Sequence, residues 1–336
     1  MSRNDISKEK LLGMYRKMVR IREFENQAIE IAKMNLTRAA IHTYNGEEAI
    51  ATGVCENLTN NDYITSTHRG HGHCIAKGAD LKKMYAELMA RESGYCKGRG
   101  GSMHIADLKI GMLGANGIVG GGIPIAVGAA FAVRFQKFDS IVVSFFGDGA
   151  TNGGSFHEAL NLAAINKLPV IFVCENNQYG ISMHVSKSTS AKNIADRSKA
   201  YGIKGLTLNG NDVAEVYTEF ANVAEEVRKG GGPVLIEMKT YRMSGHYYGD
   251  NENYRSKEEV SAWGEKDPIK NCGELLMRDY GITRQDLSTI MREERESVLA
   301  ACEEAKGEPE PAPEDLVKDV YDPSFKEIEW KAWAKK

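Results

Sequence analysis

Closely spaced cysteines and long apolar runs are both missing from this sequence. Its six cysteines, at positions 55, 74, 96, 174, 272 and 302, form no CxxC pair, which argues against a disulfide framework and against a zinc ribbon. No stretch reaches the roughly 18 apolar residues that a membrane-spanning helix needs. The start MSRNDISKEK is polar and lacks the apolar core of a signal peptide. We therefore expect reduced thiols, no membrane partner and a cytoplasmic protein.

An excess of charge of either sign is also missing. Lys and Arg total 43 against 46 Asp and Glu, which leaves a net charge of −3. This balance gives no electrostatic reason to expect nucleic acid or an anionic membrane as a partner. The 42% of hydrophobic and 26% of charged residues are ordinary values for a folded protein, and 336 residues allow one large α/β domain or two smaller ones.

The centre of the chain has the pattern of a β-α-β unit. Residues 140–146 (SIVVSFF) and 169–174 (PVIFVC) are short apolar runs rich in β-forming residues, and residues 155–168 between them have helical character. Apolar strands joined by a helix are typical of a parallel sheet that is covered on both faces, with a right-handed crossover.

The same pattern recurs downstream, and further helices flank it. Strands are expected at 205–210 and 233–242, with a helix over 212–229 between them. Apolar residues at helical spacing predict a long helix over 10–33, and more helix is expected around 257–304. The prediction is a doubly wound, mostly parallel α/β sheet with helices on both faces and helical extensions at both ends.

Glycine-rich and proline-rich segments separate these elements. Residues 67–73 (THRGHGH), 97–104 (KGRGGSMH) and 114–124 (GANGIVGGGIP) are interpreted as loops, because Gly allows main-chain amides to approach a ligand closely. The stretch EPEPAPED at 308–315 is interpreted as a solvated linker before a short C-terminal segment.

Polar residues follow the two central strands. Asp148 lies in the GDG after the first strand, and Asn177 lies in the ENN after the second. Ligands of open parallel sheets bind beyond the carboxyl ends of the strands, so these two residues are expected to converge. A carboxylate and an amide oxygen suit Mg²⁺, whose shell a diphosphate can complete. The flanking glycines and the start of the helix near Ser155 would favour the same anion.

The GDG tripeptide also permits other interpretations. An Asp between two glycines is common in exposed turns. A dinucleotide-binding dehydrogenase is a further alternative, but its GxGxxG fingerprint fails because Asn152 stands where the third Gly is required. A non-enzymatic subunit retained for assembly is the third.

The other candidate segments have alternatives too. The three histidines at 68, 71 and 73 could bind zinc, contact phosphate or substrate, or belong to a polar loop; the cationic Arg69 between them favours phosphate. His246 lies in a segment that is most simply a mobile polar loop. The small residues at 120–133 could have no role beyond close packing of a helix.

Ordered motifs along nearly the whole chain resemble one enzyme family. They are MVRIREFE at 18–25, HTYNGEEA at 42–49, KGRGGSMH at 97–104, NGIVGGGIP at 116–124, FFGDGATN at 145–152, LPVIFVCENNQYGI at 168–181 and TYRMSGHYYGD at 240–250. The chain resembles the α subunits of the thiamine-diphosphate-dependent decarboxylating components of pyruvate, branched-chain and acetoin dehydrogenase complexes. The resemblance implies one thiamine-diphosphate-binding domain over 1–336, made of an N-terminal helical extension (1–40), an α/β core (41–245), and a loop with a C-terminal helical extension (246–336).

The resemblance assigns roles to individual residues. It implies Mg²⁺ ligands at Asp148, Asn177 and the carbonyl of Tyr179. It implies diphosphate contacts from Gly149, Ala150, Arg69, His246 and His68, although His68 stands where pyruvate dehydrogenases have Tyr. It implies main-chain contacts to the aminopyrimidine from Gly117 and Val119, an apolar wedge at Ile181, and a substrate entrance lined by His42 and His71, with His246 as a further catalytic candidate.

The resemblance also implies partners. The glutamate that activates the aminopyrimidine belongs to a β subunit in this family, so the chain is expected to act only in an assembly of two α and two β chains. The product would pass to a lipoyl group on a separate acyltransferase. Residues 67–78 and 102–122 are most similar to acetoin dehydrogenase α subunits, which favours acetoin as substrate; pyruvate and branched-chain 2-oxo acids are the alternatives.

Overall fold

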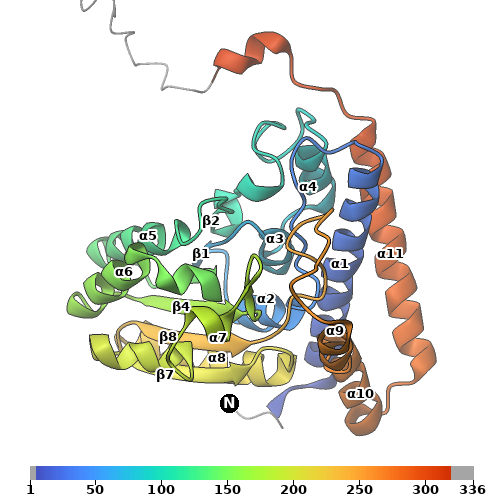
Figure 1. Ribbon diagram of the computed structural model, residues 1–336. Coiled ribbons are helices and arrows are strands. Elements are labelled where there is room, and N and C mark those ends of the chain that lie inside the picture. The colour runs from blue at the N-terminus through green and yellow to red at the C-terminus, as the bar shows by residue number, and fades with distance from the viewer. Residues whose placement is uncertain (1–4, 319–336) are drawn as a thin grey trace, which may run out of the picture.

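The computed structural model describes residues 5–318, in which six parallel strands form one sheet (Figure 1). The strand order is β2-β1-β3-β4-β8-β7, so the two predicted β-α-β units share one sheet. The predicted α/β class with a mostly parallel sheet is confirmed. The strands are β1 (Tyr63–Thr65), β2 (Met112–Gly114), β3 (Val142–Gly147), β4 (Val170–Asn176), β7 (Lys204–Asn209) and β8 (Val234–Lys239).

Side chains of the central strands alternate between two apolar cores, one on each face of the sheet. Val143 and Phe145 of β3 belong to the core that includes residues of α2 and α8, whereas Val142 and Phe146 belong to the core that includes residues of α5 and α6. This alternation is the reason why the central strands are apolar throughout. The covering helices are α2 (Glu48–Cys55), α5 (Gly122–Gln136), α6 (Gly154–Ile165) and α8 (Val213–Arg228).

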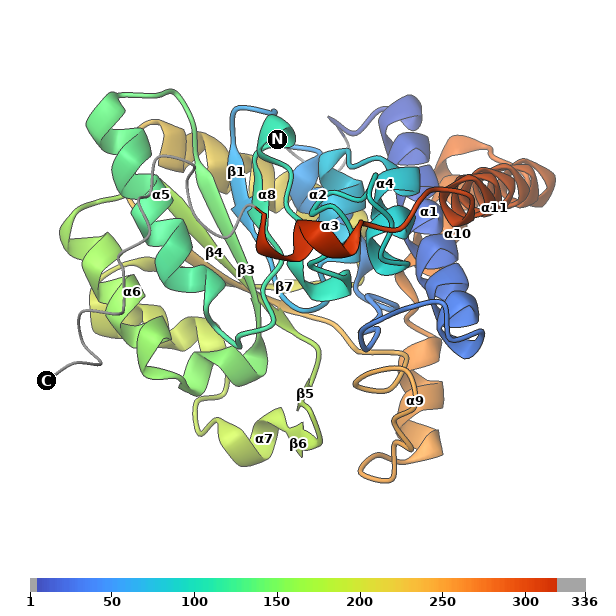
Figure 2. The ribbon, with the colours of Figure 1, turned by 90° about the horizontal axis from the view of Figure 1, so that it is seen from above.

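The helical extensions pack beside one another at one end of the sheet (Figure 2). Helix α1 (Lys8–Lys33) begins after Ser7, whose hydroxyl accepts a hydrogen bond from the Lys10 amide. The region predicted as helix around 257–304 is divided into α9 (Lys257–Gly264), α10 (Pro268–Tyr280) and α11 (Arg284–Lys306). Asp267 caps α10 ahead of Pro268, and Gly281 ends it at φ 67°.

Two loop predictions were wrong in part. The segment 67–73 ends in helix α3 (His71–Lys77), and the segment 114–124 ends in the first turn of α5. The stretch 308–315 is not simply a solvated linker, because the Pro309 carbonyl accepts a hydrogen bond from the Glu92 amide and Glu310 pairs with Arg91. The C-terminal segment expected after them lies outside the described residues.

Within residues 5–318 no helix has both the length and the apolar character needed to cross a membrane. Shorter elements complete the described chain. The shorter helices and strands are α4 (Leu81–Leu88), α7 (Val185–Ser188), β5 (Tyr179–Gly180) and β6 (Met183–His184), and the short 3-10 helices are η2 (Ser102–His104), η3 (Leu108–Ile110), η4 (Asp148–Asn152), η5 (Ile194–Tyr201) and η6 (Pro313–Val317).

Candidate functional site

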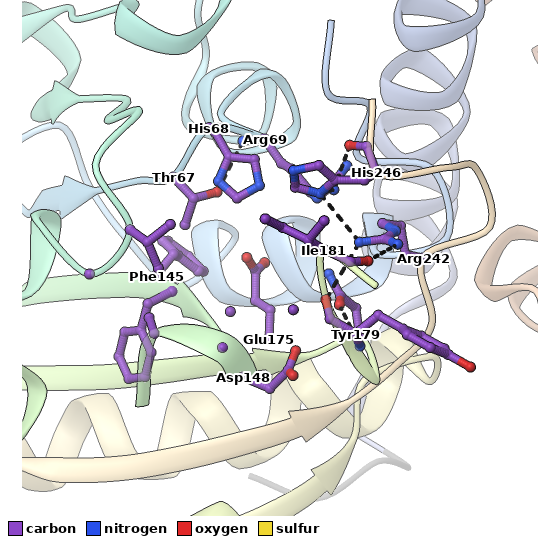
Figure 3. Close-up of a pocket in the computed structure, with 18 of the residues that line it drawn as sticks. Thr67, His68, Arg69, Phe145, Asp148, Glu175, Tyr179, Ile181, Arg242 and His246 are labelled. Carbon is purple, nitrogen blue, oxygen red and sulfur yellow. Dashed lines mark hydrogen bonds between the residues drawn. The ribbon is translucent and has the colours of Figure 1, made fainter. Parts of the chain in front are cut away.

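A cavity of about 330 Å³ lies at the carboxyl ends of β3 and β4. The loops that follow β1 and β8 face these strand ends across it (Figure 3). Open parallel sheets bind their ligands at this edge. Ten of the residues predicted for the site line the cavity: His68, Arg69, Val119, Asp148, Gly149, Ala150, Asn177, Tyr179, Ile181 and His246.

The structure brings Asp148 and Asn177 to this one cavity. Strand β3 ends at Gly147 and β4 ends at Asn176, so Asp148 and Asn177 are the first residues after these strands. The two strand ends are neighbours, because Gly147 lies opposite Glu175 in the parallel register. Both side chains are buried, at 1% and 6% exposure. The predicted convergence of Asp148 and Asn177 is therefore present, although 28 residues lie between them in the chain.

The Asp148 carboxylate lacks the partners that a buried charge needs. Its Oδ2 is buried and accepts no hydrogen bond from any residue of the described chain. Burial raises the pKa of Asp148 to about 7. A buried carboxylate in this state is stabilised either by a proton or by a cation in the cavity.

Two further oxygens beside Asp148 are weakly engaged. Asn177 Oδ1 accepts a long hydrogen bond of 3.4 Å from the Tyr179 amide, and the Tyr179 carbonyl accepts one of 3.5 Å from Arg242 Nη1. Carboxylate, amide and carbonyl oxygens are the ligands that Mg²⁺ prefers. The unpartnered oxygen of Asp148 and the chemistry of the three donors therefore fit a magnesium ion.

Two buried guanidinium groups provide the opposite charge. Arg69 is 4% exposed and Arg242 is 1% exposed, and neither forms an ion pair with a carboxylate within residues 5–318. Arg69 donates to the carbonyls of Thr43 and His246, at 2.8 Å each. Burial lowers the pKa of Arg69 to about 10, so the group remains cationic at neutral pH. Unpaired buried cations of this kind fit a phosphate group.

The main chain approaches closely at Gly149. A Cβ added to Gly149 would lie 3.3 Å from the Cα of Gly180, and one added to Gly180 would lie 3.4 Å from the Cα of Gly149. Both residues line the cavity, as does Ala150, and the 12-residue helix α6 begins just beyond, at Gly154. The backbone amides of this turn and the helix start are suited to an anion.

Ile181 stands at the mouth of the cavity in a strained conformation. Its φ is 54°, a region that β-branched residues rarely adopt, and its side chain is 61% exposed. Arg242 Nη2 donates a hydrogen bond of 2.8 Å to the Ile181 carbonyl and so holds this conformation. Strain that is held by a buried cation beside a cavity is typical of functional sites.

Three imidazoles form a cluster beside the cavity, and two of them, His68 and His246, line it. The ring of His42 lies 5.0 Å from the rings of His68 and His246, between centroids, and those two rings are 5.5 Å apart. Burial, together with the charge of Arg69, lowers the pKa of His42 to about 4, of His68 to about 2 and of His246 to about 3. All three rings are therefore neutral at pH 7.

The structure places His71 outside the cavity. Its side chain is fully buried, and its two ring nitrogens contact Glu25 at 2.8 Å and Ser102 at 2.9 Å. It connects α1, α3 and η2 and does not line the cavity. Gly117 and His42 are likewise outside the lining, although Ile118 and Val119, which follow Gly117, belong to it, as do His68 and His246, which contact the His42 ring.

The neutral histidines predict a dependence of stability on pH. Below pH 6.5, the ordinary pKa of histidine, each ring takes up a proton when the chain unfolds. The contribution of each histidine to the free energy of unfolding is therefore complete above pH 6.5. It is lost as the pH falls toward the lowered pKa of the folded state. For His42, the loss between pH 7 and pH 5 is about 2 kcal/mol. In denaturant unfolding, the stability of the wild type relative to His42→Gln should therefore fall by about 2 kcal/mol between pH 7 and pH 5. An unchanged pH dependence in the variant would contradict it.

Comparison with known proteins places this arrangement in a family. The family model described as "Dehydrogenase E1 component" matches residues 16–314. The chain belongs to the dehydrogenase E1 component family. This E1 chain is thus part of a thiamine-diphosphate-dependent oxidoreductase, and the dinucleotide-binding alternative falls away.

Curated relatives of this E1 chain match it almost from end to end. The α subunit of acetoin:2,6-dichlorophenolindophenol oxidoreductase from Bacillus subtilis is 47% identical over 94% of this chain and 95% of its own length. The protein of the same name from Cupriavidus necator is 44% identical, with the same two coverages. The α subunit of the pyruvate dehydrogenase E1 component from Rickettsia bellii is 36% identical over 94% of this chain and 96% of its own length.

Sequence reasoning gave no role to three charged residues of the E1 cavity, which are Arg242, Glu47 and Glu175. Arg242 lies just beyond β8, a strand whose carboxyl end meets the same edge of the sheet as β3 and β4, so the rule that identified Asp148 would have found it. Glu47 lies in the GEE of a recognised motif, but nothing in its spacing distinguishes it from Glu48.

The loop that carries His246 is held by named contacts. The His246 amide donates to Asp250 Oδ2 at 2.7 Å, and the Tyr254 hydroxyl donates to the same oxygen at 2.5 Å. Tyr254 also accepts a hydrogen bond of 2.6 Å from Arg242 Nη2. These contacts connect this polar E1 loop to the cavity.

Proposed function

We propose that this chain is the α subunit of an E1 component that cleaves acetoin, with thiamine diphosphate held by Mg²⁺ in the cavity at β3 and β4. The single observation that carries the proposal is the unpartnered oxygen of the buried Asp148, beside Asn177 and the Tyr179 carbonyl. The unpaired guanidinium of Arg69 supports a diphosphate at the same place. Acetoin is favoured because two curated relatives at 47% and 44% identity are named for it.

Thiamine diphosphate, when bound, supplies a carbon centre that accepts the electrons released when a bond beside a carbonyl breaks. Asp148, Asn177 and the Tyr179 carbonyl would hold the magnesium ion. The amides of Gly149 and Ala150 and the side chain of Arg69 would bind the diphosphate. The hydrogen bond from Arg242 fixes the position of Ile181. The Ile181 side chain would then support the cofactor as an apolar wedge between the two rings of the cofactor.

The histidine cluster would handle the substrate. His42 Nδ1 is buried and has no hydrogen-bond partner in the described part of the chain. The ring is neutral at pH 7 and does not line the cavity, so it would act on the substrate through the neighbouring rings that do. His68 and His246 stand within ring contact of it and would shape the same space.

The mouth of the cavity supports a partner chain. Ile118, Val119 and Ile181 line the cavity and are 74%, 66% and 61% exposed, respectively. Exposed apolar groups around a binding site are typical of a surface that another chain covers. We infer that a β subunit completes the site with the activating glutamate, in a cytoplasmic assembly of two α and two β chains that delivers its product to a lipoyl acyltransferase.

Pyruvate is the second candidate substrate. The chain is 36% identical to a pyruvate dehydrogenase E1 α subunit. Acetoin has no carboxylate, whereas pyruvate and the branched-chain 2-oxo acids each carry one. The higher identity to the two relatives that are named for acetoin favours acetoin.

The substrate is tested with the assembled enzyme. The chain is co-expressed with the β chain of its own organism, and dye reduction is measured with acetoin, pyruvate and a branched-chain 2-oxo acid, each with and without Mg²⁺. We expect turnover with acetoin that needs both the β chain and Mg²⁺. Turnover with pyruvate but not with acetoin would reject the substrate and leave the cofactor in place. Turnover that persisted without Mg²⁺ after chelation would reject the metal site.

A further inference from the structure

Glu47 is a buried acid of the cavity to which the proposed reaction gives no task. Its side chain is 1% exposed and lines the same cavity as Asp148 and Asn177. Its Oε1 accepts a hydrogen bond of 3.0 Å from Asn177 Nδ2. Its Oε2 is buried and has no hydrogen-bond partner among the residues that the structure describes.

The neighbouring Glu48 has the contacts expected of a buried glutamate that stabilises the fold. Glu48 is fully buried, accepts a hydrogen bond of 3.0 Å from the Gly46 amide and pairs with Arg22. Glu47 has no cation within ion-pair distance in the described chain and leaves one oxygen unsatisfied. A half-satisfied buried carboxylate costs stability. Its position is therefore better explained by the cavity than by the fold.

The bond between Glu47 and Asn177 fixes which way the amide faces. A carboxylate oxygen accepts hydrogen bonds, so Glu47 Oε1 selects the NH₂ group of Asn177 rather than its oxygen. Asn177 Oδ1 is consequently turned to the other side, where it lies 3.4 Å from the Tyr179 amide. A rotation of the amide by 180° would bring two acceptor oxygens together and would present NH₂ to a cation.

We propose that Glu47 is a positioning residue that holds Asn177 Oδ1 toward the magnesium ion. This inference rests on the proposed function, because it assumes that Asn177 is a ligand of the metal. Partners that orient the ligands of a metal typically contribute a factor of about 10 to 100 in metal affinity. Glu47 would act on the metal through Asn177, without reacting itself.

Two substitutions separate orientation from charge. Mg²⁺ is titrated calorimetrically into the assembly of this chain with its β chain, in the presence of thiamine diphosphate. Glu47→Ala removes the acceptor, and we expect it to raise the Mg²⁺ dissociation constant about tenfold or more. Glu47→Gln keeps an amide oxygen that can accept the same hydrogen bond from Asn177, so its dissociation constant should stay close to that of the wild type.

The melting temperature of the metal-free assembly is the second measurement, because substitution of a purely structural residue would lower it. Glu47→Gln removes an unsatisfied buried carboxylate and should not lower this temperature. The matched control is Glu48→Gln, which weakens the pair with Arg22. It should lower the melting temperature and leave the Mg²⁺ dissociation constant unchanged.

The outcomes separate this inference from the proposed function. An unchanged Mg²⁺ affinity in Glu47→Ala would overturn the role of Glu47, and so would an equal loss in Glu47→Gln, because the residue would then act through its charge. A loss of affinity matched by a loss of metal-free stability in both Glu47 variants would make the residue structural. A wild-type assembly that binds thiamine diphosphate without Mg²⁺ would reject the metal site itself, and with it the role of Glu47.

Discussion

Asp148→Asn is expected to abolish turnover and Mg²⁺-dependent binding of thiamine diphosphate while the fold stays intact. The substitution removes the only charge among the three proposed ligands. It also replaces a buried carboxylate that has an unpartnered oxygen with a neutral amide of the same size. We expect turnover to fall on the order of 1,000-fold, which corresponds to about 4 kcal/mol of lost transition-state stabilisation. Dye reduction and calorimetric titration of the assembly with its β chain measure both effects.

Stability distinguishes this loss from misfolding. The metal-free Asp148→Asn variant should melt no lower than the wild type, because the carboxylate pays a desolvation cost that the amide largely avoids. The control is Asp139→Asn, which changes an exposed residue shortly before the same strand and should preserve binding and turnover. Retained Mg²⁺-dependent binding in Asp148→Asn would contradict the ligand assignment.

Glu87→Ala is expected to cause the largest loss of stability. The Glu87 carboxylate is 1% exposed and accepts four backbone hydrogen bonds, from the amides of residues 96, 98, 100 and 101, at 2.7 to 3.0 Å. It organises the KGRGGSMH segment, which was predicted as a loop. Its removal leaves four donors without their acceptor, and we expect the free energy of unfolding to fall by about 3 to 5 kcal/mol.

Hydrogen exchange localises that effect. The amides of residues 96–101 should exchange faster in Glu87→Ala, and Ser102, which follows them, should no longer be held against His71. Glu87→Gln keeps one of the two acceptor oxygens and should have an intermediate stability. Glu92→Ala, at an exposed position nearby, should have little effect. Unchanged exchange in residues 96–101 would show that another contact orders the segment.

Local patterns predicted the elements of the core with small errors at their ends. The strand expected over 140–146 is observed as Val142–Gly147, and the one over 169–174 as Val170–Asn176. Their apolar runs need a sheet covered on both faces, so few other arrangements were open to them. The two segments whose loop prediction was wrong in part, 67–73 and 114–124, end in the first turns of α3 and α5.

The histidines show where prediction from the sequence ends. His68 and His71 belong to one short motif, yet His68 lines the cavity while His71 is fully buried against Glu25 and Ser102. Helix α3 begins at His71 and turns that side chain toward the core. The resemblance placed both residues at the site, and the packing of α1 against α3 separated them.

By itself, the sequence determined the fold class, the family and the aspartate and asparagine at the strand ends, because apolar periodicity, turn residues and ordered motifs are local properties of the chain. Only the tertiary structure decided which of two adjacent glutamates reaches the cavity, which histidines face it, and that Asp148 and Arg69 are buried without ionic partners among residues 5–318. Those properties arise between residues far apart in the sequence, such as Glu47 and Asn177, which are 130 residues apart. The desolvation and the hydrogen bonds that govern their chemistry exist only once the chain has folded.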